Sequence, residues 1–381
     1  MSTDARRLGL PVVKAPDAGV RTVPLPAPAA LEVANVGARD GIVIPGWLPW
    51  LGLRLLSGVA TMLVISLLVF IATQALPSDP ARVILGADAS EESVRTLQVQ
   101  LGLDRPILEQ YVHWAGRALT GDFGSSLDSS VPASTIVSDR FGNSATLMIV
   151  VLLLAVPLAF AGGVALAMRR DGWVDRWSMN ALILFKALPG FVLAIGLILI
   201  FSTTIFQILP AVSLLDPERS PLAQPAFLVL PVVTLVLTVA PFLLRLVRAA
   251  MIETLESDYV AAARLRGIPE RWIIWRHAVP NTLVPAIQGM ALTARMLLGG
   301  AVIIEVVFSY PGIGNALNAA IELRDVPVIQ AITLTLAAAV VAINLLADVA
   351  TVFATPKLRT AERPQLRPGT RAALKLRAGS V

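Results

Sequence analysis

Long runs of uncharged, mostly apolar residues recur along this chain and constrain its fold more than any other feature. A helix needs about 20 such residues to cross a membrane, because each residue adds about 1.5 Å. Five runs reach this length without a charge, over 55–78, 141–168, 187–215, 220–244 and 326–347, and a sixth, over 282–305, is interrupted at Arg295. The sequence therefore predicts an all-α polytopic membrane protein with six transmembrane helices.

The composition excludes several other classes of protein. Of the 381 residues, 56% are hydrophobic and 15% are charged, whereas soluble domains carry about 25% charged residues. The chain has no cysteine, which excludes disulfides and thiolate metal sites, and its two histidines, His113 and His277, lie far apart. We therefore expect neither a metal nor a cofactor on this chain.

The distribution of Lys and Arg predicts an orientation. If both termini are cytoplasmic, the segments 1–54, 169–186, 245–276 and 357–381 face the inside and hold 23 of the 31 Lys and Arg residues. Cytoplasmic segments of membrane proteins carry such an excess. We therefore predict a multi-pass protein of the cell membrane with both termini inside. The net charge of +5 follows from this orientation and does not indicate a nucleic-acid partner.

The spans divide the chain into segments. We predict a disordered cytoplasmic tail over 1–49, a first transmembrane helix over 50–76, an extracytoplasmic helical region over 77–140, a core of five spans over 141–355, and a basic cytoplasmic tail over 356–381. In the extracytoplasmic region, a capping box from Asp88 to Glu91 predicts one helix, and Pro106 opens a second that ends at Gly121. This region is either an ordinary packed loop or a docking surface for a soluble partner.

The cytoplasmic loop over 245–281 is too long for a turn and too polar for a span. Residues 258–267 predict a short helix that begins at Asp258, whose carboxylate complements the helix dipole, and stops at a left-handed Gly267. A second helix is predicted from Pro269 to the residue before Pro280, which makes the loop a rigid protrusion. Four residues share one face of the first helix: Tyr259, Ala262, Ala263 and Arg266.

This loop resembles that of the inner-membrane permease subunits of binding-protein-dependent ABC importers. Their loop reads Glu-Ala-Ala, three residues, Gly, nine residues, Ile, one residue, Leu-Pro. Here Ala261-Ala262-Ala263 precedes Gly267 at the right interval, and His277-Ala278-Val279-Pro280 closes the pattern, with departures at Ala261, His277 and Val279. The departures look like the dipeptide, oligopeptide and nickel branch, as do Asp258-Tyr259-Val260 and Arg276-His277-Ala278. Elsewhere Gly121-Asp-Phe-Gly124 and Pro311-Gly-Ile-Gly314 are similar to the same branch, so the resemblance covers about residues 50–359.

The resemblance implies a type I ABC importer permease fold with a small helical extracytoplasmic insertion between the first two spans. It implies a non-catalytic subunit that forms half of a translocation path for di- or oligopeptides, with nickel complexes, haem or another small solute as alternative cargoes. The implied partners are a homologous second permease, two ATP-binding subunits, an extracytoplasmic substrate-binding protein and the lipid bilayer. ATP and Mg²⁺ would bind to the ATPase subunits, since this chain has no Gly-x-x-x-x-Gly-Lys-Ser/Thr phosphate loop.

Two groups of residues follow as site candidates. Coupling to the ATPase is expected of Asp258, Tyr259, Ala262, Ala263, Arg266, Gly267, His277 and Pro280. A translocation path or gate is expected of Arg295, Glu305, Pro311, Gly312 and Gly314. An arginine at mid-depth costs about 2.5–3.5 kcal/mol on insertion, so Arg295 faces either other protein groups or a water-filled path. The segment 311–314 is either a loop turn or an outer gate.

Two other functions fit the sequence less well. A secondary transporter usually carries ionisable residues within its spans and internal repeats. Here only Arg295, Glu305 and Asp348 approach the spans, mostly near their ends, and no repeat is visible. A membrane-embedded hydrolase would need a motif such as Gly-x-Ser-x-Gly or His-Glu-x-x-His, and neither occurs in the sequence.

Overall fold

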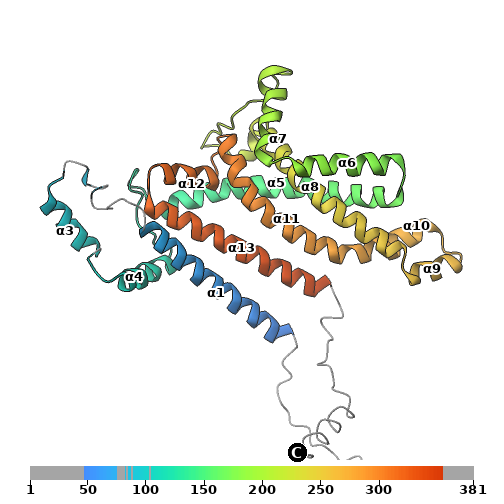
Figure 1. Cartoon of the computed structure of the whole chain (residues 1–381), viewed down its shortest axis with the longest axis horizontal. Coiled ribbons are helices and arrows are strands. Elements are labelled where there is room, and N and C mark those ends of the chain that lie inside the picture. Colours follow the sequence, from blue (N-terminus) through green and yellow to red (C-terminus); the bar gives the residue numbers. More distant parts are fainter. Residues whose placement is uncertain (1–46, 75–81, 83–84, 87–88, 103, 355–381) are drawn as a thin grey trace, which may run out of the picture. The chain divides into compact units, whose positions relative to one another are not determined.

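Helices make up the regular structure that the computed structural model describes, which covers residues 47–74, 82, 85–86, 89–102 and 104–354 (Figure 1). Within these residues, five helices are long and apolar enough to cross a membrane, and a bent pair of helices raises the number to six if it counts as one span. The predicted all-α, six-span fold is therefore confirmed. The tails predicted at the two ends of the chain lie, over 1–46 and 355–381, outside the described residues.

Five long helices form the framework: α1 (Trp47–Gln74), α5 (Ala133–Met168), α8 (Pro225–Leu255), α11 (Val279–Val307) and α13 (Val326–Ala354). They correspond to the predicted first, second, fourth, fifth and sixth spans. Two boundaries differ from the prediction. α1 begins at Trp47, three residues before the predicted first span, and α5 begins at Ala133, inside the region predicted over 77–140.

The third predicted span, over 187–215, is not one helix. α6 (Trp173–Ala187) and α7 (Gly190–Ile198), which η1 (Leu199–Thr204) extends, meet at an angle of 100°. Pro189 explains the break, because it has no N–H to continue the helical hydrogen bonds and holds Leu188 extended, with ψ at 131°. The predicted cytoplasmic segment over 169–186 is therefore mostly helix, and only residues 169–172 connect α5 to α6.

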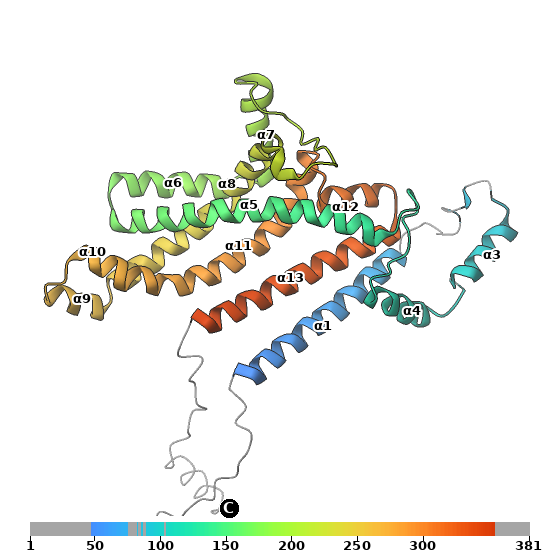
Figure 2. The same ribbon diagram turned by 180° about the vertical axis from the view of Figure 1, so that it is seen from behind.

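The core lies where α5, α8 and α11 pack together, with α7 and α13 beside them (Figures 1 and 2). Two glycines allow the closest approaches. A Cβ at Gly163 on α5 would lie 2.8 Å from Val247 of α8, and one at Gly289 on α11 would lie 2.3 Å from Leu246 of α8. Small residues at such crossings let membrane helices pack closely. α1 lies outside this core and packs against α13.

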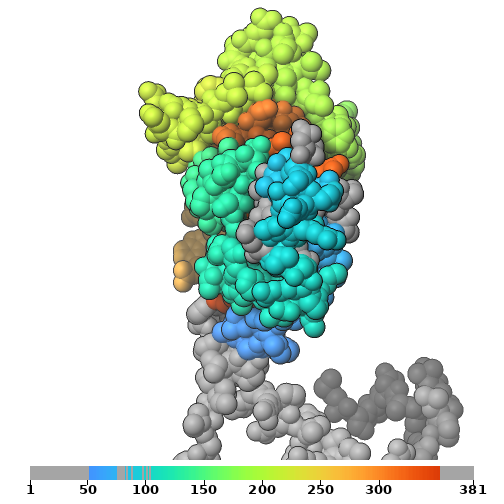
Figure 3. Space-filling model, turned by 90° about the vertical axis from the view of Figure 1, so that its left-hand side faces the viewer, coloured from blue at the N-terminus to red at the C-terminus, as the bar shows by residue number. Residues whose placement is uncertain are grey.

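Two short helices precede α5, namely α3 (Glu91–Leu101) and α4 (Ile107–Leu119). Ser90, not Asp88, caps α3, since its Oγ accepts a hydrogen bond from the backbone N–H three residues on, at 3.2 Å; Asp88 itself lies outside the described residues. α4 packs against α1 through an aromatic cluster whose ring centroids lie 5.5–6.1 Å apart, formed by Phe70, Tyr111 and Trp114. Figure 3 views the molecule from the side on which α3 and α4 lie.

Candidate functional site

The loop between α8 and α11 contains the predicted short helix, α9 (Asp258–Leu265), at the opposite end of the spans from α3 (Figures 1 and 2). Two hydrogen bonds close its C-terminus: the Gly267 N–H donates to the Arg264 carbonyl at 2.9 Å, and the Ile268 N–H donates to the Ala263 carbonyl at 3.2 Å. This pattern is a Schellman motif, which favours a left-handed glycine at its turn. Gly267 has a φ of +76°, so the predicted left-handed stop is confirmed.

Arg264 joins three elements around this turn. Its guanidinium donates to both carboxylate oxygens of Glu270, at 3.2 and 2.6 Å, and to the Leu255 carbonyl at the end of α8, at 3.2 Å. The hydrogen bond with Glu270 raises the pKa of Arg264 above its ordinary value. Both side chains are about half exposed, so the pair adds little Coulomb energy, and its effect is to fix the geometry of the loop.

The structure revises the predicted docking face of α9. Ala263 is 7% exposed and lies in a small core within the loop, together with Val260, Ile268 and Ile273. Leu265, by contrast, is 90% exposed and was not predicted to contribute. Ala263 is therefore turned inward. The outer face of α9 includes the exposed residues Tyr259, Ala261, Leu265 and Arg266, with Ala262 half-buried among them.

The second helix of the loop does not stop before Pro280, as the sequence suggested. α10 (Glu270–Ile273) passes through a π-helical turn, η3 (Ile274–Ala278), directly into α11, so the chain stays helical over 270–307. Pro280 lies in the first turn of α11, where the altered hydrogen bonding of the π turn accommodates a residue without an N–H. We call residues 270–307 the rod. Within the predicted loop over 245–281, residues 245–255 therefore belong to α8 and residues 270–281 belong to the rod.

Asn281 connects α9 to the rod. Its Nδ2 donates to the Tyr259 hydroxyl and to the His277 carbonyl, both at 2.8 Å. His277 is half-buried on η3 and contributes its backbone carbonyl to this contact. Sequence reasoning missed Asn281 and Glu270, because no local pattern indicates which polar side chain on a helix reaches a neighbouring one.

Two ion pairs tie α8 to the hairpin of α5 and α6 near the same end. Arg248 on α8 donates to both carboxylate oxygens of Asp175 on α6, at 2.7 and 2.6 Å. The Asp175 side chain is 3% exposed, and breaking such a buried pair costs about 3–5 kcal/mol. Arg170, in the turn between α5 and α6, pairs with Glu256 at the end of α8. The base of the loop is therefore fixed to α6 as well as to α8.

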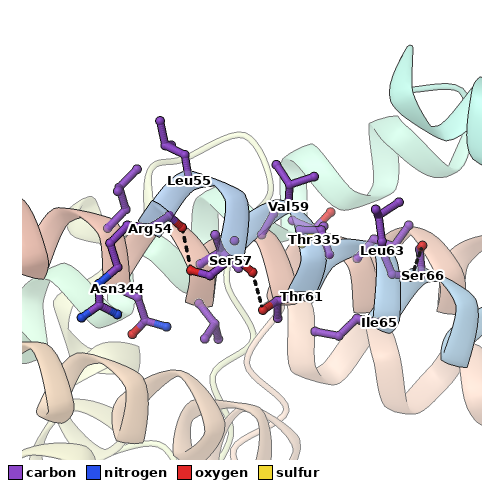
Figure 4. A pocket seen from close by; sticks show the side chains of 18 of the residues that line it. Arg54, Leu55, Ser57, Val59, Thr61, Leu63, Ile65, Ser66, Thr335 and Asn344 are labelled. Atoms are coloured by element: carbon purple, nitrogen blue, oxygen red, sulfur yellow. Dashed lines mark hydrogen bonds between the residues drawn. The ribbon is translucent and has the colours of Figure 1, made fainter. Parts of the chain in front are cut away.

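A groove of about 1380 Å³ lies between α1, α11 and α13, with α4 lining part of it (Figure 4). Arg295 lines this groove with its side chain exposed, and it makes no hydrogen bond or ion pair with another residue in the described part of the chain. The hydroxyls of Ser57 and Thr61, in contrast, bond to carbonyls of their own helix at 2.8 Å. Of the five residues predicted for a path or gate, Arg295 is therefore the one on a groove wall.

The other four residues predicted for the path or gate lie at the far end of the rod. Glu305 is fully buried, and its carboxylate accepts hydrogen bonds from the Ser144 hydroxyl of α5 at 2.6 Å and from the Gly314 N–H at 2.7 Å. α12 (Ile313–Glu322) begins at this point. The carboxylate therefore caps the first turn of α12, where negative charge complements the helix dipole.

Close contacts around Glu305 explain the glycines of the 311–314 segment. A Cβ on Gly312 would lie 2.4 Å from the Glu305 side chain, and one on Gly314 would lie 2.5 Å from the backbone of Val302. The Pro311 carbonyl accepts a hydrogen bond from the Asn143 side chain at 2.9 Å. We call this arrangement the outer clasp; it consists of Asn143, Ser144, Glu305, Pro311, Gly312 and Gly314. It joins α5, α11 and α12 and does not line the groove.

Known protein families match almost the whole described chain. Residues 155–360 match the family described as binding-protein-dependent transport system inner membrane component, and residues 48–147 match the N-terminal part of such membrane components. The chain belongs to this family. The matched region contains the loop, the groove helices and the outer clasp, so these features belong to an ABC importer permease subunit that is embedded in the inner membrane through several helices.

Curated relatives support the same conclusion. The glutathione transport system permease protein GsiC of Shigella flexneri serotype 5b (strain 8401) is 35% identical over 306 residues, which are 80% of this chain and 97% of that protein. The protein of the same name from Escherichia coli (strain K12) gives the same identity and coverage. This permease subunit is non-catalytic, because ATP hydrolysis in such importers belongs to separate ATPase subunits, and a substrate-binding protein completes the system.

Proposed function

We propose that this permease imports di- or oligopeptides as half of a heterodimeric membrane core. A homologous permease forms the other half, two ATPase subunits bind on the cytoplasmic side, and one substrate-binding protein docks on the opposite side. ATP and Mg²⁺ bind to the ATPase subunits, and this chain binds no cofactor of its own. Both termini and α9 face the cytoplasm, as the excess of Lys and Arg in these segments supports.

The geometry of α9 carries the proposal. Two large side chains of α9 are exposed, Leu265 at 90% and Tyr259 at 45%, and tyrosine is enriched at contacts between proteins. The Gly267 turn, Arg264 and Asn281 hold α9 against α8 and the rod. A displacement of α9 by an ATPase subunit would therefore move two spans, which is the stiff connection that coupling requires.

The remaining predicted coupling residues support this helix. Asp258 occupies its first turn, and its negative charge complements the dipole of α9. His277 and Pro280 lie where η3 passes into α11. In this proposal they set the direction in which the rod leaves the loop, while Tyr259, Ala262, Leu265 and Arg266 contact the ATPase.

Two observations support a peptide as cargo. The relatives are named for glutathione, which is itself a small peptide, and the groove offers amide and guanidinium groups that can bind amides and carboxylates. Nickel complexes, haem and other small solutes are the alternative cargoes. Mass spectrometry of the ligand that copurifies with the assembled transporter and its binding protein distinguishes among them.

Leu265→Glu tests the coupling role. The new charge would lie on the outer face of α9, so it should prevent the ATPase from docking while leaving the inner core of the loop intact. In proteoliposomes that contain the assembled transporter, we expect ATP-dependent uptake to fall at least tenfold, which corresponds to about 1.4 kcal/mol of lost contact. Stimulation of ATP hydrolysis by the loaded binding protein should fall with it.

Leu214→Glu is the matched control, because Leu214 is also strongly exposed, at 70%, but lies in the connection between α7 and α8. It introduces the same charge outside the loop and should leave uptake unchanged. Membrane insertion of both variants is checked by their amounts in purified membranes. Wild-type uptake by Leu265→Glu would show that α9 is not the docking element.

A further inference from the structure

Besides Trp114, whose indole N–H is buried without a hydrogen-bond partner, three polar side chains in the groove have no partner. Gln288 and Arg295 on α11 and Asn344 on α13 all line the groove, and none of them bonds to another residue in the part of the chain that the structure describes (Figure 4 labels Asn344). Gln288 and Arg295 are seven residues apart, so they share one face of α11. Polar groups at membrane depth need protein, water or a ligand as partners. These three side chains therefore indicate a hydrated groove with unused binding capacity.

The positions of Gln288 and Arg295 along α11 separate the two side chains within the groove. Arg295 lies 16 residues from the start of α11 and 12 residues from its end, so it is near the middle of α11. Gln288 lies nine residues from the start of α11, and Asn344 lies ten residues from the end of the opposing α13. At 1.5 Å per residue, Arg295 lies about 10 Å beyond Gln288 along α11, and Asn344 lines the groove from α13.

Arg295 is the one ionic residue on the described lining of the groove that has no ion-pair partner. The other ionic residues on its described lining are Arg54 and Asp348, and these two pair with each other at 3.1 Å. A guanidinium can bind a carboxylate through two parallel hydrogen bonds, which makes arginine suited to carboxylate recognition. The groove therefore offers one carboxylate-binding group, Arg295, and two amide-binding groups, Gln288 and Asn344.

We propose that Arg295 binds a carboxylate of the cargo as it passes, while Gln288 and Asn344 bind its amide groups. This inference rests on the proposed import function and specifies the cargo as peptide-like solutes with a free carboxylate. The volume of about 1380 Å³ exceeds the roughly 300–1,000 Å³ of ordinary small-molecule pockets, so a short peptide fits.

The first test measures the charge preference of the groove without any cargo. The chain has no native cysteine, and Ala291, one turn from Arg295, also lines the groove. In the assembled transporter, Ala291→Cys should react faster with an anionic methanethiosulfonate reagent than with a cationic one of similar size. Adding Arg295→Gln should lower the ratio of the two rates about tenfold, from a Coulomb interaction over one helical turn in water, and Arg295→Lys should preserve it. An unreactive cysteine or an unchanged ratio overturns the proposal.

The second test compares a tripeptide that has a free C-terminal carboxylate with the same tripeptide as its C-terminal amide. In proteoliposomes, Arg295→Gln should lower the maximal uptake rate of the free acid at least tenfold and leave the amide unaffected. The half-saturating concentration should not change, because the binding protein captures the peptide first. Arg295→Lys should retain part of the rate. Arg219→Gln, which removes an exposed charge in the connection between α7 and α8, should behave as wild type.

The outcomes separate the two proposals. If the wild-type transporter takes up no peptide in an ATP-dependent manner, the proposed function fails and the cargo role of Arg295 fails with it. If the wild type is active and Arg295→Gln transports acid and amide at wild-type rates, only the role of Arg295 is refuted. An equal loss of both forms would assign Arg295 a structural role and would also overturn the proposal.

Discussion

Gly267 allows a test of backbone geometry alone. Its φ of +76° is one that residues with a Cβ adopt with difficulty, yet a Cβ built there would have no atom within 4 Å. Substitution therefore adds conformational strain without a clash. The series Gly267→Asn, Gly267→Ala and Gly267→Val varies this strain, because asparagine tolerates the left-handed region and a β-branched residue tolerates it least.

The size of the expected effect follows from the free-energy cost of the left-handed backbone conformation. A residue with a Cβ pays about 1–2 kcal/mol to adopt it, so the ratio of closed to open loop should fall by a factor of about 5–30 for alanine and more for valine. The open loop loses the Ile268-to-Ala263 hydrogen bond and the position of Glu270 next to Arg264. The outer face of α9 is then no longer held against α8 and the rod.

Two assays follow the series in proteoliposomes with the binding protein. Uptake and stimulated ATP hydrolysis should decrease in the order Gly, Asn, Ala, Val. Arg266 is exposed at the end of α9. Tryptic cleavage after Arg266 should increase in the same order, because trypsin cleaves this backbone more readily when the loop is open. If asparagine impairs uptake as much as valine, the left-handed backbone is not the cause. Wild-type activity of the valine variant would refute the need for a rigid loop.

Two further predictions concern the outer clasp and the orientation. Glu305→Gln replaces an acceptor oxygen by an NH₂ group that faces backbone N–H groups in need of an acceptor. This should lower the stability of the fold by about 1–3 kcal/mol, so the melting temperature of the purified subunit should fall. The exposed Glu322→Gln on the same α12 should not change it; equal melting of both variants would contradict the capping role. For the orientation, Ser125→Cys should react with an impermeant thiol reagent from outside intact cells, whereas Ala261→Cys should react only after the membrane is opened. The reverse labelling pattern would contradict a cytoplasmic α9.

Most spans and the short helix could be predicted because their signals are local. The length of a charge-free run determines whether a helix can cross a membrane, and this criterion located α1, α5, α8 and α13. α11 was located in spite of the single charge of Arg295 within its apolar run. Helix α9 begins with Asp258, whose negative charge complements the helix dipole, and is followed by the left-handed Gly267. These two residues mark the ends of the helix without any knowledge of the rest of the fold. The same signals did not indicate which face of α9 is buried, because alanine suits both an internal core and a docking surface.

The features that the sequence did not predict depend on distant partners. Pro189 ends a helix, whereas Pro157, Pro231 and Pro241 lie inside α5 and α8 without ending them. Residue type alone therefore does not decide whether a span breaks, since neighbouring helices can satisfy the freed backbone groups. A second case is Glu305, whose role as a cap depends on Ser144 on α5, 161 residues away in the sequence.

The rod runs through the loop, the groove and the outer clasp, so a displacement at its loop end should be transmitted to the other two. Its 38 residues extend about 57 Å, with Glu270 bonded to Arg264 at one end, Arg295 in the groove, and Glu305 in the clasp near the other end. Close packing at Gly289 holds the rod against α8, and the buried pair of α8 with Asp175 extends this attachment to α6. A displacement of α9 should therefore move α6, α8 and α11 together. α1 contacts this group of helices through α13, which packs against both α11 and α1. The same displacement should therefore change the width of the groove between α11 and α1 only if α1 does not follow α13. Arg295 lies on α11, the wall that this displacement would move. If Arg295 binds the cargo carboxylate as proposed, its contact with the cargo should therefore depend on the state of the ATPase.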